Sequence, residues 1–378
     1  MKATNFVFLF FLALFNIQGE SATKVFNLKD YGAIPGGQVD NSKALLKAWG
    51  DACNSHGGST LEVPSATYLV YPVTLSGPCK GPMLFHNIGI LKGPSGLQGN
   101  SWVSFQYING LTLTGGTFDG QGSPKQTTPN LPALLSFDFM TNSRAQCVTL
   151  INSRNTHFQI FACNQIDIDN ITISSPGDSV NTDGIKIGNS NSITITNTNI
   201  GCGDDCVAVL PNSKDINVTG VTCGPGHGIS IGSMGGSANE RVEHVTVTNC
   251  IISNTLNGLR IKSKTTNMPG LVNNVRYENI SFQNVDNPII IDQNYCPSRT
   301  CHQGDSRVQI QNVEFINVHG TSVTPVAVNL QCSGTNPCTG IDLNDINIPY
   351  FKQGATTISK CLNARGRSSG VQIPKSCI

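Results

Sequence analysis

Charged residues make up 12% of the 378-residue chain and glycine occurs 39 times, a composition that excludes an ordinary helical protein, which carries about twice that share of charge. The 24 basic and 23 acidic side chains give a net charge of +1, so bulk nucleic-acid binding, which normally needs a basic surplus, is disfavoured. Recurrent valine and isoleucine together with low net charge also exclude extensive disorder. The composition therefore indicates a turn-rich, β-rich globular protein.

The first segment has the pattern of a secretion signal. Lys2 precedes an apolar run from Phe6 to Phe15, and small residues such as Ala22 follow. This pattern is typical of a cleaved signal peptide, and the run is too short to cross a bilayer comfortably. We therefore predict a signal peptide over residues 1–22 and a secreted, extracellular mature chain with no membrane segment. Three glycosylation acceptors would be usable in that compartment: Asn170, Asn217 and Asn279.

One segment near the N-terminus has helical periodicity. Asp40 is the expected N-cap, and the apolar residues that follow form one stripe before the Gly57-Gly58 break: Ala44, Leu45, Ala48, Trp49 and Ala52. A short amphipathic helix of this kind could cover the open end of a β structure. An ordinary surface helix fits the pattern equally well.

Fourteen cysteines in a secreted chain indicate disulfides. Pairs close in the sequence are the best candidates: Cys53 with Cys79, Cys206 with Cys223, Cys296 with Cys301, Cys332 with Cys338, and Cys361 with Cys377. Four others could be buried thiols: Cys147, Cys163, Cys202 and Cys250. Zinc is the alternative, but the sequence lacks paired CxxC motifs and a CxxC-plus-HxxxH arrangement, so we expect no structural zinc.

The middle of the chain repeats a five-residue pattern with apolar third and fifth positions. The five segments begin at Asp183, Asp205, His227, Asn257 and Asn287, which are 22, 22, 30 and 30 residues apart. A second series of short strands lies between them: Ile193-Thr-Ile, Ile216-Asn-Val, Val245-Thr-Val and Val275-Arg-Tyr. Turns rich in asparagine and glycine close each unit.

A repeat of 20 to 30 residues built from short strands is typical of a solenoid. The unit should be one coil of a parallel β-helix, which buries alternate side chains and pairs its backbone with the coils on either side. A β-propeller is the alternative, although its units are nearer forty residues long. We therefore predict an all-β parallel β-helix that forms a single domain over residues 23–378.

Stacked coils would turn the repeat into a column of chemical groups. Asp183, Asp205 and His227 share one register, so their backbones should lie about 4.8 Å apart on successive coils. Asp204 adjoins this column beside Gly203, where glycine permits irregular backbone. Each such residue alone could be an ordinary turn residue bonded to its own backbone. Stacked like charges repel, however, and clustered carboxylates mark functional sites.

The following coil adds two cations. Alternation buries Leu259 and Ile261 and directs Arg260 and Lys262 outward, where we expect exposed side chains whose loss hardly affects stability. Carboxylates without a serine nucleophile motif suggest glycoside hydrolysis by an acid and a base. Clustered aspartates could instead bind calcium, but the adjacent cations disfavour a metal and favour an anionic sugar.

At these residues the chain resembles the polygalacturonases, the pectin-cleaving glycoside hydrolases. Four motifs occur in order at fitting spacing: Asn181-Thr-Asp183, Gly203-Asp-Asp205, Gly226-His-Gly228 and Arg260-Ile-Lys262. Three further segments extend the resemblance over nearly the whole mature chain: Tyr31-Gly-Ala33, the DGQG run within Gly116–Gly122, and Asn294-Tyr-Cys296. The resemblance implies a right-handed β-helix that hydrolyses α-1,4 bonds between galacturonic acids with inversion, without metal or organic cofactor.

The same resemblance implies roles for individual residues. Asp204 would be the general acid, Asp183 and Asp205 would hold and activate the water, and His227 would tune protonation or bind the sugar. The substrate-binding residues would be Arg260, Lys262, Tyr295 and Asn181. The partner would be pectin or polygalacturonate in the cell wall, bound by a monomer that contacts neither nucleic acid nor membrane.

The residues that flank the motifs are most similar to those of the plant pollen-type exopolygalacturonases, as in Ser175–Asp183 and Tyr295-Cys-Pro297. Two departures stand out. Ser123-Pro-Lys-Gln-Thr-Thr replaces an expected tryptophan segment, and Lys186 stands where histidine or an acidic residue is expected. Exo action is the favoured prediction, and two alternatives stay open: endo action, and a feebly active or inactive β-helix that binds pectin.

Overall fold

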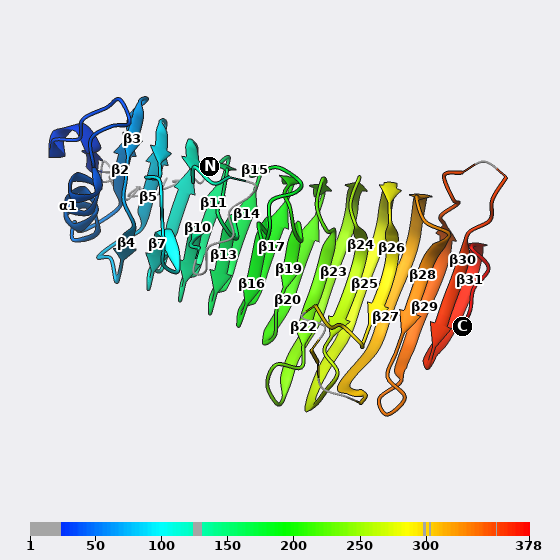
Figure 1. Ribbon diagram of the computed structural model, residues 1–378. Coiled ribbons are helices and arrows are strands. Elements are labelled where there is room, and N and C mark those ends of the chain that lie inside the picture. Colours follow the sequence, from blue (N-terminus) through cyan, green and yellow to red (C-terminus); the bar gives the residue numbers. More distant parts are fainter. Residues whose placement is uncertain (1–23, 124–130, 298–299, 302–303, 353) are drawn as a thin grey trace, which may run out of the picture.

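The chain winds into a parallel β-helix whose coils follow one another from the N-terminal to the C-terminal end (Figure 1). A computed structural model describes residues 24–123, 131–297, 300–301, 304–352 and 354–378. The predicted signal peptide and most of the segment that replaces the expected tryptophan lie outside these residues. The predicted fold class is confirmed, and a β-propeller is excluded because consecutive coils pair in parallel.

Two sheets make up the coils. The 11-stranded sheet consists of β4 (Val73–Ser76), β7 (Ser101–Gln106), β10 (Ala133–Asp138), β13 (Phe158–Phe161), β16 (Ile185–Gly188), β19 (Val207–Val209), β22 (Ile229–Met234), β24 (Asn257–Ser263), β26 (Asn287–Asp292), β28 (Val326–Gln331) and β30 (Ile358–Leu362). We call it the site sheet, because its strands follow the residues singled out from the sequence.

The remaining strands form one 20-stranded sheet in two rows. The first row is β1 (Lys24–Asn27), β2 (Ser59–Val63), β5 (Met83–Asn87), β8 (Leu111–Thr114), β11 (Thr141–Gln146), β14 (Asn164–Asp169), β17 (Asn191–Thr196) and β20 (Ser213–Thr219). The second row is β3 (Thr67–Leu69), β6 (Ile90–Lys92), β9 (Thr117–Asp119), β12 (Thr149–Ile151), β15 (Thr172–Ser174), β18 (Asn199–Gly201) and β21 (Thr222–Cys223). Longer strands continue both rows: β23 (Glu240–Ser253), β25 (Thr266–Val285), β27 (Ser306–Ser322), β29 (Cys338–Asn347) and β31 (Ala364–Ile373).

The register of the site sheet follows the repeat found in the sequence. Ile185 pairs with Val207, Val207 with Ile229, Ile229 with Leu259, and Leu259 with Ile289. These are the third positions of the five aligned segments, and all are at most 1% exposed. Alternate side chains therefore fill the coil interior, and the positions between them are free to carry chemistry on the outer face.

Aromatic side chains fill the N-terminal half of the core. Phe105, Phe137 and Phe158 lie on consecutive strands of the site sheet, and Phe85 faces Phe105 from β5 of the other sheet. Consecutive rings meet edge to face at centroid distances of 5.4, 5.7 and 5.0 Å. All four are fully buried. Edge-to-face contact is a favoured arrangement of aromatic rings, so this column adds cohesion between coils beyond the backbone pairing.

Asparagines form ladders at the turns between strands. Asn189 and Asn212 both have left-handed φ, of 51° and 61°, and the Asn212 amide donates to Oδ1 of Asn189 at 3.0 Å. In another ladder Asn317 donates to Asn279, which donates to Asn249. Asparagine tolerates left-handed backbone better than most residues, which explains the asparagine-rich turns of the sequence.

The helix α1 (Ser42–Cys53) covers the N-terminal end of the coils (Figure 1). Trp49 is buried, donates from its indole nitrogen to the Ser76 carbonyl at 3.0 Å, and meets Phe105 edge to face. The N-cap position is Asn41, one residue after the predicted Asp40, and Asn41 makes no side-chain cap bond. Asp40 nevertheless accepts from the Ser42 backbone nitrogen at 2.9 Å, the kind of bond that caps a helix. Among the described residues, no helix is long and apolar enough to span a bilayer.

Five disulfides join the cysteine pairs expected from sequence proximity: Cys53–Cys79, Cys206–Cys223, Cys296–Cys301, Cys332–Cys338 and Cys361–Cys377. Cys163, Cys202 and Cys250 are buried thiols. Burial raises the pKa of the Cys163 and Cys202 thiols to about 12 and that of Cys250 to about 11. Cys147 is exposed, so burial was the wrong expectation for this thiol.

Candidate active site

The carboxylates and the histidine lie where the chain enters three consecutive strands of the site sheet. Asp183 precedes β16, Asp204 and Asp205 precede β19, and His227 precedes β22. The ligand atoms of Asp204, Asp205 and His227 all lie within 4.8 Å of one another. The structure thus brings the predicted catalytic residues together on the outer face of adjacent coils.

The backbone beside Asp204 is packed too closely for a side chain. A Cβ at Gly203 would lie 1.9 Å from the Ser179 carbonyl oxygen, and the Gly203 amide donates to Oγ1 of Thr182 at 2.9 Å. Glycine is therefore required here for close approach between coils. The disulfide of Cys206 with Cys223 follows directly and ties this turn to the next coil.

Asp205 lies at the centre of a buried ion-pair network. Its Oδ1 accepts from Arg260 Nη2 at 2.6 Å and from Ser230 Oγ at 2.7 Å, and its Oδ2 accepts from Lys262 Nζ at 2.9 Å. The exposed fractions of Arg260 and Lys262 are only 8% and 7%. The expectation of solvent-exposed cations was wrong: both side chains leave the coil interior, but Asp205 and neighbouring side chains cover them.

Asp204 pairs with His227. Nδ1 of His227 lies 3.0 Å from Oδ1 of Asp204, and the Asp205 amide donates to the same oxygen at 2.8 Å. Burial alone would raise the pKa of Asp204, but the hydrogen bond and charge of His227 outweigh it and hold that pKa below its usual value. In the free protein Asp204 therefore favours the ionised state.

Asp183 has the opposite electrostatic setting. Burial raises its pKa to about 6, partly offset by Lys186, and the charges of Asp204 and Asp205 raise it further. Nζ of Lys186 lies 2.5 Å from Oδ2 of Asp183. Asp183 therefore holds a proton more readily than Asp204 in the free protein, whereas the sequence resemblance implies a protonated Asp204.

The two remaining candidate residues are Tyr295, which lies beside the cations, and Asn181, which is exposed in a turn. The Tyr295 ring centroid is 5.2 Å from Nζ of Lys262 and 5.9 Å from the Arg260 guanidinium carbon, and burial raises the pKa of Tyr295. Asn181 is exposed, with a left-handed φ of 58°, in the turn before Asp183. Tyr295 thus forms one wall beside the cations, and Asn181 lies on the solvent side.

Two contacts of the site were not predicted from the sequence: the hydrogen bond from Ser230 to Asp205 and the ion pair of Lys186 with Asp183. Ser230 and Lys186 occupy the fourth, outward position of the aligned repeat segments, as Arg260 does, and the strand pairing places all three on one row of the site sheet. Comparing the fourth positions of the repeat would have identified this row. The polar fourth positions were visible in the sequence, but Lys186 and Ser230 lie outside the four motifs from which the site was predicted.

A metal at Asp204, Asp205 and His227 is sterically conceivable because their ligand atoms converge. Asp205, however, already accepts from two cations and a hydroxyl. A divalent ion would compete with Arg260 and Lys262 for the same oxygens, and the network also supplies fewer oxygen ligands than calcium prefers. The donor set fits ion pairing better than metal binding.

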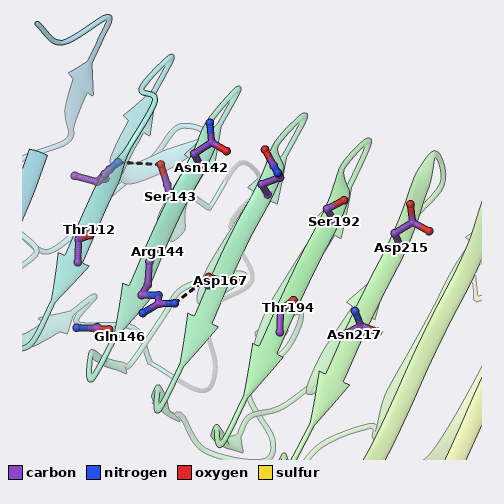
Figure 2. A pocket seen from close by; sticks show the side chains of 12 residues that line it. Thr112, Asn142, Ser143, Arg144, Gln146, Asp167, Ser192, Thr194, Asp215 and Asn217 are labelled. Atoms are coloured by element: carbon purple, nitrogen blue, oxygen red, sulfur yellow. Dashed lines mark hydrogen bonds and ion pairs between the residues drawn. The ribbon is translucent and has the colours of Figure 1, made fainter. Parts of the chain in front are cut away.

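A hollow of about 800 Å³ lies on the 20-stranded sheet, away from these carboxylates. Figure 2 shows its polar lining, in which the Arg144 side chain pairs with Asp167 at 3.0 Å on the neighbouring strand. Asn217, one of the glycosylation candidates, also lines it. Asn170, Asn217 and Asn279 are all exposed, so the three acceptors are sterically available on this sheet.

Glycoside hydrolases cleave their substrates with a pair of carboxyl groups, one that gives a proton and one that takes one, and the cluster on the outer face of this β-helix offers carboxyl groups for that chemistry. Residues 53–373 match the family Glycosyl hydrolases family 28. The chain belongs to this family.

Proteins with similar sequences support the family resemblance that the motifs indicated. The chain is 40% identical to an exopolygalacturonase of Platanus acerifolia over 94% of this chain and 98% of the relative. It is 38% identical to an exopolygalacturonase of Zea mays, covering 98% and 97%, and 38% identical to a polygalacturonase of Gossypium hirsutum, covering 98% and 93%. The resemblance to plant polygalacturonases stated from the motifs is confirmed.

Solved structures share the fold at low sequence identity. The endo-xylogalacturonan hydrolase of Aspergillus tubingensis superposes with a TM-score of 0.79 at 22% identity, covering 92% of this chain and 99% of that chain. The polygalacturonase of Erwinia carotovora gives 0.71 at 24% identity, covering 92% and 97%. These likenesses support the right-handed parallel β-helix and carry no inference about substrate.

We expect the pKa of Asp183 to make stability depend on pH. The folded-state pKa of about 6 lies above the ordinary 3.8, so the free energy of unfolding falls as pH rises from about 4 to about 6 and stays lower above. Asp183→Asn removes this penalty and should raise stability above pH 6 by roughly 2–3 kcal/mol, with no gain below pH 4. Thermal melts across this range test it. The exposed Asp178→Asn is the control, and a gain independent of pH would contradict the assignment.

The network around Asp205 predicts that Lys262 is needed for stability. Lys262→Met leaves a buried carboxylate with one cation fewer, and breaking a buried pair costs about 3–5 kcal/mol. Lys264, an exposed lysine two residues further on, supplies the matched control Lys264→Met, which should change little. Urea unfolding of the two variants gives the comparison; equal midpoints would mean that Lys262 is not held by Asp205.

Proposed function

We propose that this chain hydrolyses, with inversion, the α-1,4 bonds between galacturonic acid residues of de-esterified pectin, acting from a chain end. The observation that carries the proposal is the cluster of three carboxylates in distinct electrostatic settings beside two buried cations. The 40% identity to a protein named exopolygalacturonase supports the substrate and the exo mode.

Hydrolysis requires one carboxyl group to give a proton and another to take one. We assign the acid to Asp204, which protonates the glycosidic oxygen as the bond from that oxygen to the anomeric carbon breaks. Asp183 takes a proton from the water that attacks the anomeric carbon. A raised pKa makes Asp183 the stronger base once it is ionised. Asp205, held by cations, orients the water.

The acid must regain its proton in the complex, because His227 favours the ionised Asp204 in the free protein. A bound galacturonate brings a further negative charge and displaces water, and both effects raise the pKa of a neighbouring carboxyl group. Substrate binding thus supplies the electrostatic change that the free site lacks. His227 then governs how readily Asp204 is protonated.

Arg260 and Lys262 have a double task in this proposal. Both already donate to Asp205, and a guanidinium, which has five N–H donors, can also donate to a substrate carboxylate. Tyr295 lies against the same two cations and would confine the sugar there. Asn181, on the solvent side of Asp183, would contact the sugar hydroxyls.

The proposed activity also has consequences for the location and the oligomeric state of the protein. We infer a monomer that is secreted after removal of residues 1–22, with residues 23–378 forming one catalytic domain in the cell wall. The partner is the pectin polysaccharide rather than a nucleic acid or a membrane. No organic cofactor or metal is required by the acid–base scheme.

Product analysis tests the proposed activity. De-esterified polygalacturonate should yield monomeric galacturonic acid from the first turnovers, because exo action releases one residue at each cut. Chromatography over time measures this, and NMR of the first product should show an inverted anomeric centre. A ladder of oligomers would mean endo action instead, and a polymer that stays intact would favour a pectin-binding protein without activity.

Leaving-group chemistry separates the acid from the base. Asp204→Asn and Asp183→Asn should each lower kcat on polygalacturonate by about 10² to 10⁴ or more, the usual value of acid–base assistance. With 4-nitrophenyl galacturonide the departing group needs no proton, so Asp204→Asn should recover within about tenfold of the unmodified protein while Asp183→Asn stays impaired. Recovery of Asp183→Asn instead would exchange the two roles.

A further inference from the structure

A second hollow, of about 790 Å³, lies on the site sheet itself, over β4, β7, β10 and β13. It adjoins the candidate active site because Gln159 of β13, which lines it, pairs with Lys186 of β16. We call it the N-terminal groove. Its described lining is Thr74, Gly99, Asn100, Ser101, Ser104, Gln106, Leu131, Asp138, Phe139, Asn155, Gln159 and Phe161.

The described lining of the N-terminal groove carries no cationic side chain that would attract an anion. Its described lining residues include no lysine, arginine or histidine, and Asp138 is the one acidic side chain among them. Oδ2 of Asp138 accepts from Ser136 at 2.8 Å and from Ser104 at 3.0 Å. A galacturonate carboxylate placed here would meet Asp138 and no cation of the described lining, in contrast to the active site, whose residues begin one coil further on and whose Arg260 and Lys262 lie four coils beyond β13.

Aromatic rings border the same groove. Tyr107, Phe139 and Phe161 lie on three consecutive coils and are 55%, 45% and 38% exposed. The Tyr107 and Phe139 rings stack at 4.9 Å, and Phe139 meets Phe161 edge to face at 5.9 Å. Three contiguous exposed rings are an apolar surface of the kind that marks binding sites. Flat aromatic faces beside hydroxyl and amide groups suit the C–H face and hydroxyls of a sugar ring.

We propose that the N-terminal groove is an accessory site for uncharged pyranose residues, such as methyl-esterified galacturonate or neutral pectic sugars. It holds the protein on uncharged stretches of pectin while the cations of the active site select a charged residue for cleavage. The choice of pectin as the polymer rests on the proposed function. The two sources of an uncharged pyranose, an esterified galacturonate or a neutral sugar, share the same recognition chemistry.

Binding to polymers without carboxylates tests this site apart from catalysis. In affinity electrophoresis the protein should bind fully methyl-esterified polygalacturonate, neutral β-1,4-galactan, or both, and the polymers retained identify the source. Phe139→Ala should weaken that binding about tenfold, equivalent to about 1.4 kcal/mol, and Phe161→Ala should act in the same direction. Phe351→Ala, which removes a 58%-exposed ring elsewhere, is the matched control and should leave binding unchanged. Activity on de-esterified polygalacturonate should also be unchanged in Phe139→Ala.

Three results would each overturn the accessory site. The first is binding of neither uncharged polymer by the unmodified protein. The second is equal binding by the unmodified protein and Phe139→Ala, and the third is a Phe139→Ala defect confined to the de-esterified polymer. Failure of the proposed hydrolase function would appear separately, as absence of galacturonate release in the product analysis, because the electrophoresis needs no bond cleavage.

Discussion

Backbone pairing between consecutive coils is the constraint on which the rest of the molecule depends. It places Ile185, Val207, Ile229 and Leu259 in one buried row although 22 to 30 residues separate them in the chain. Because inward positions are mostly apolar to fill the coil, most polar groups of the strands lie on the outer face. Residues of distant sequence thereby become neighbours without any long-range loop.

Stacking carboxylates at coil spacing is electrostatically unfavourable, and each carboxylate of the cluster is compensated differently. Asp205 is paired with Arg260 and Lys262, Asp204 with His227, and Asp183 with Lys186. Compensation is least complete at Asp183, where burial outweighs the single lysine and raises the pKa. One repeated geometry thus moves the pKa values of two neighbouring carboxyl groups in opposite directions, that of Asp183 up and that of Asp204 down, which is what acid–base chemistry requires.

The apolar pattern of five-residue segments was enough to predict the register, because strand periodicity leaves one choice of which side chains face inward. It was not enough to predict the burial of Arg260 and Lys262. Their exposure depends on how far long side chains reach along the outer face and on which acceptor they find, Asp205 two coils away for Lys262. The lowered pKa of Asp204 in the free protein could not be predicted for the same reason, since it depends on a hydrogen bond from His227 on the next coil.

The side chains on the outer face of the site sheet differ in charge and polarity along the solenoid, whereas those on its inner face stay mostly apolar. Over β4 to β13 the outward groups are hydroxyls, amides and one carboxylate, bordered by exposed rings. From β16 to β24 they are lysine, serine and arginine around buried aspartates. Because outward positions contribute little to the core, they can vary coil by coil without disturbing the fold. A long polymer lying along this face would therefore contact different side chains at each coil. The position of a sugar along the sheet, rather than the shape of a single pocket, then decides whether binding requires its carboxylate or disfavours it.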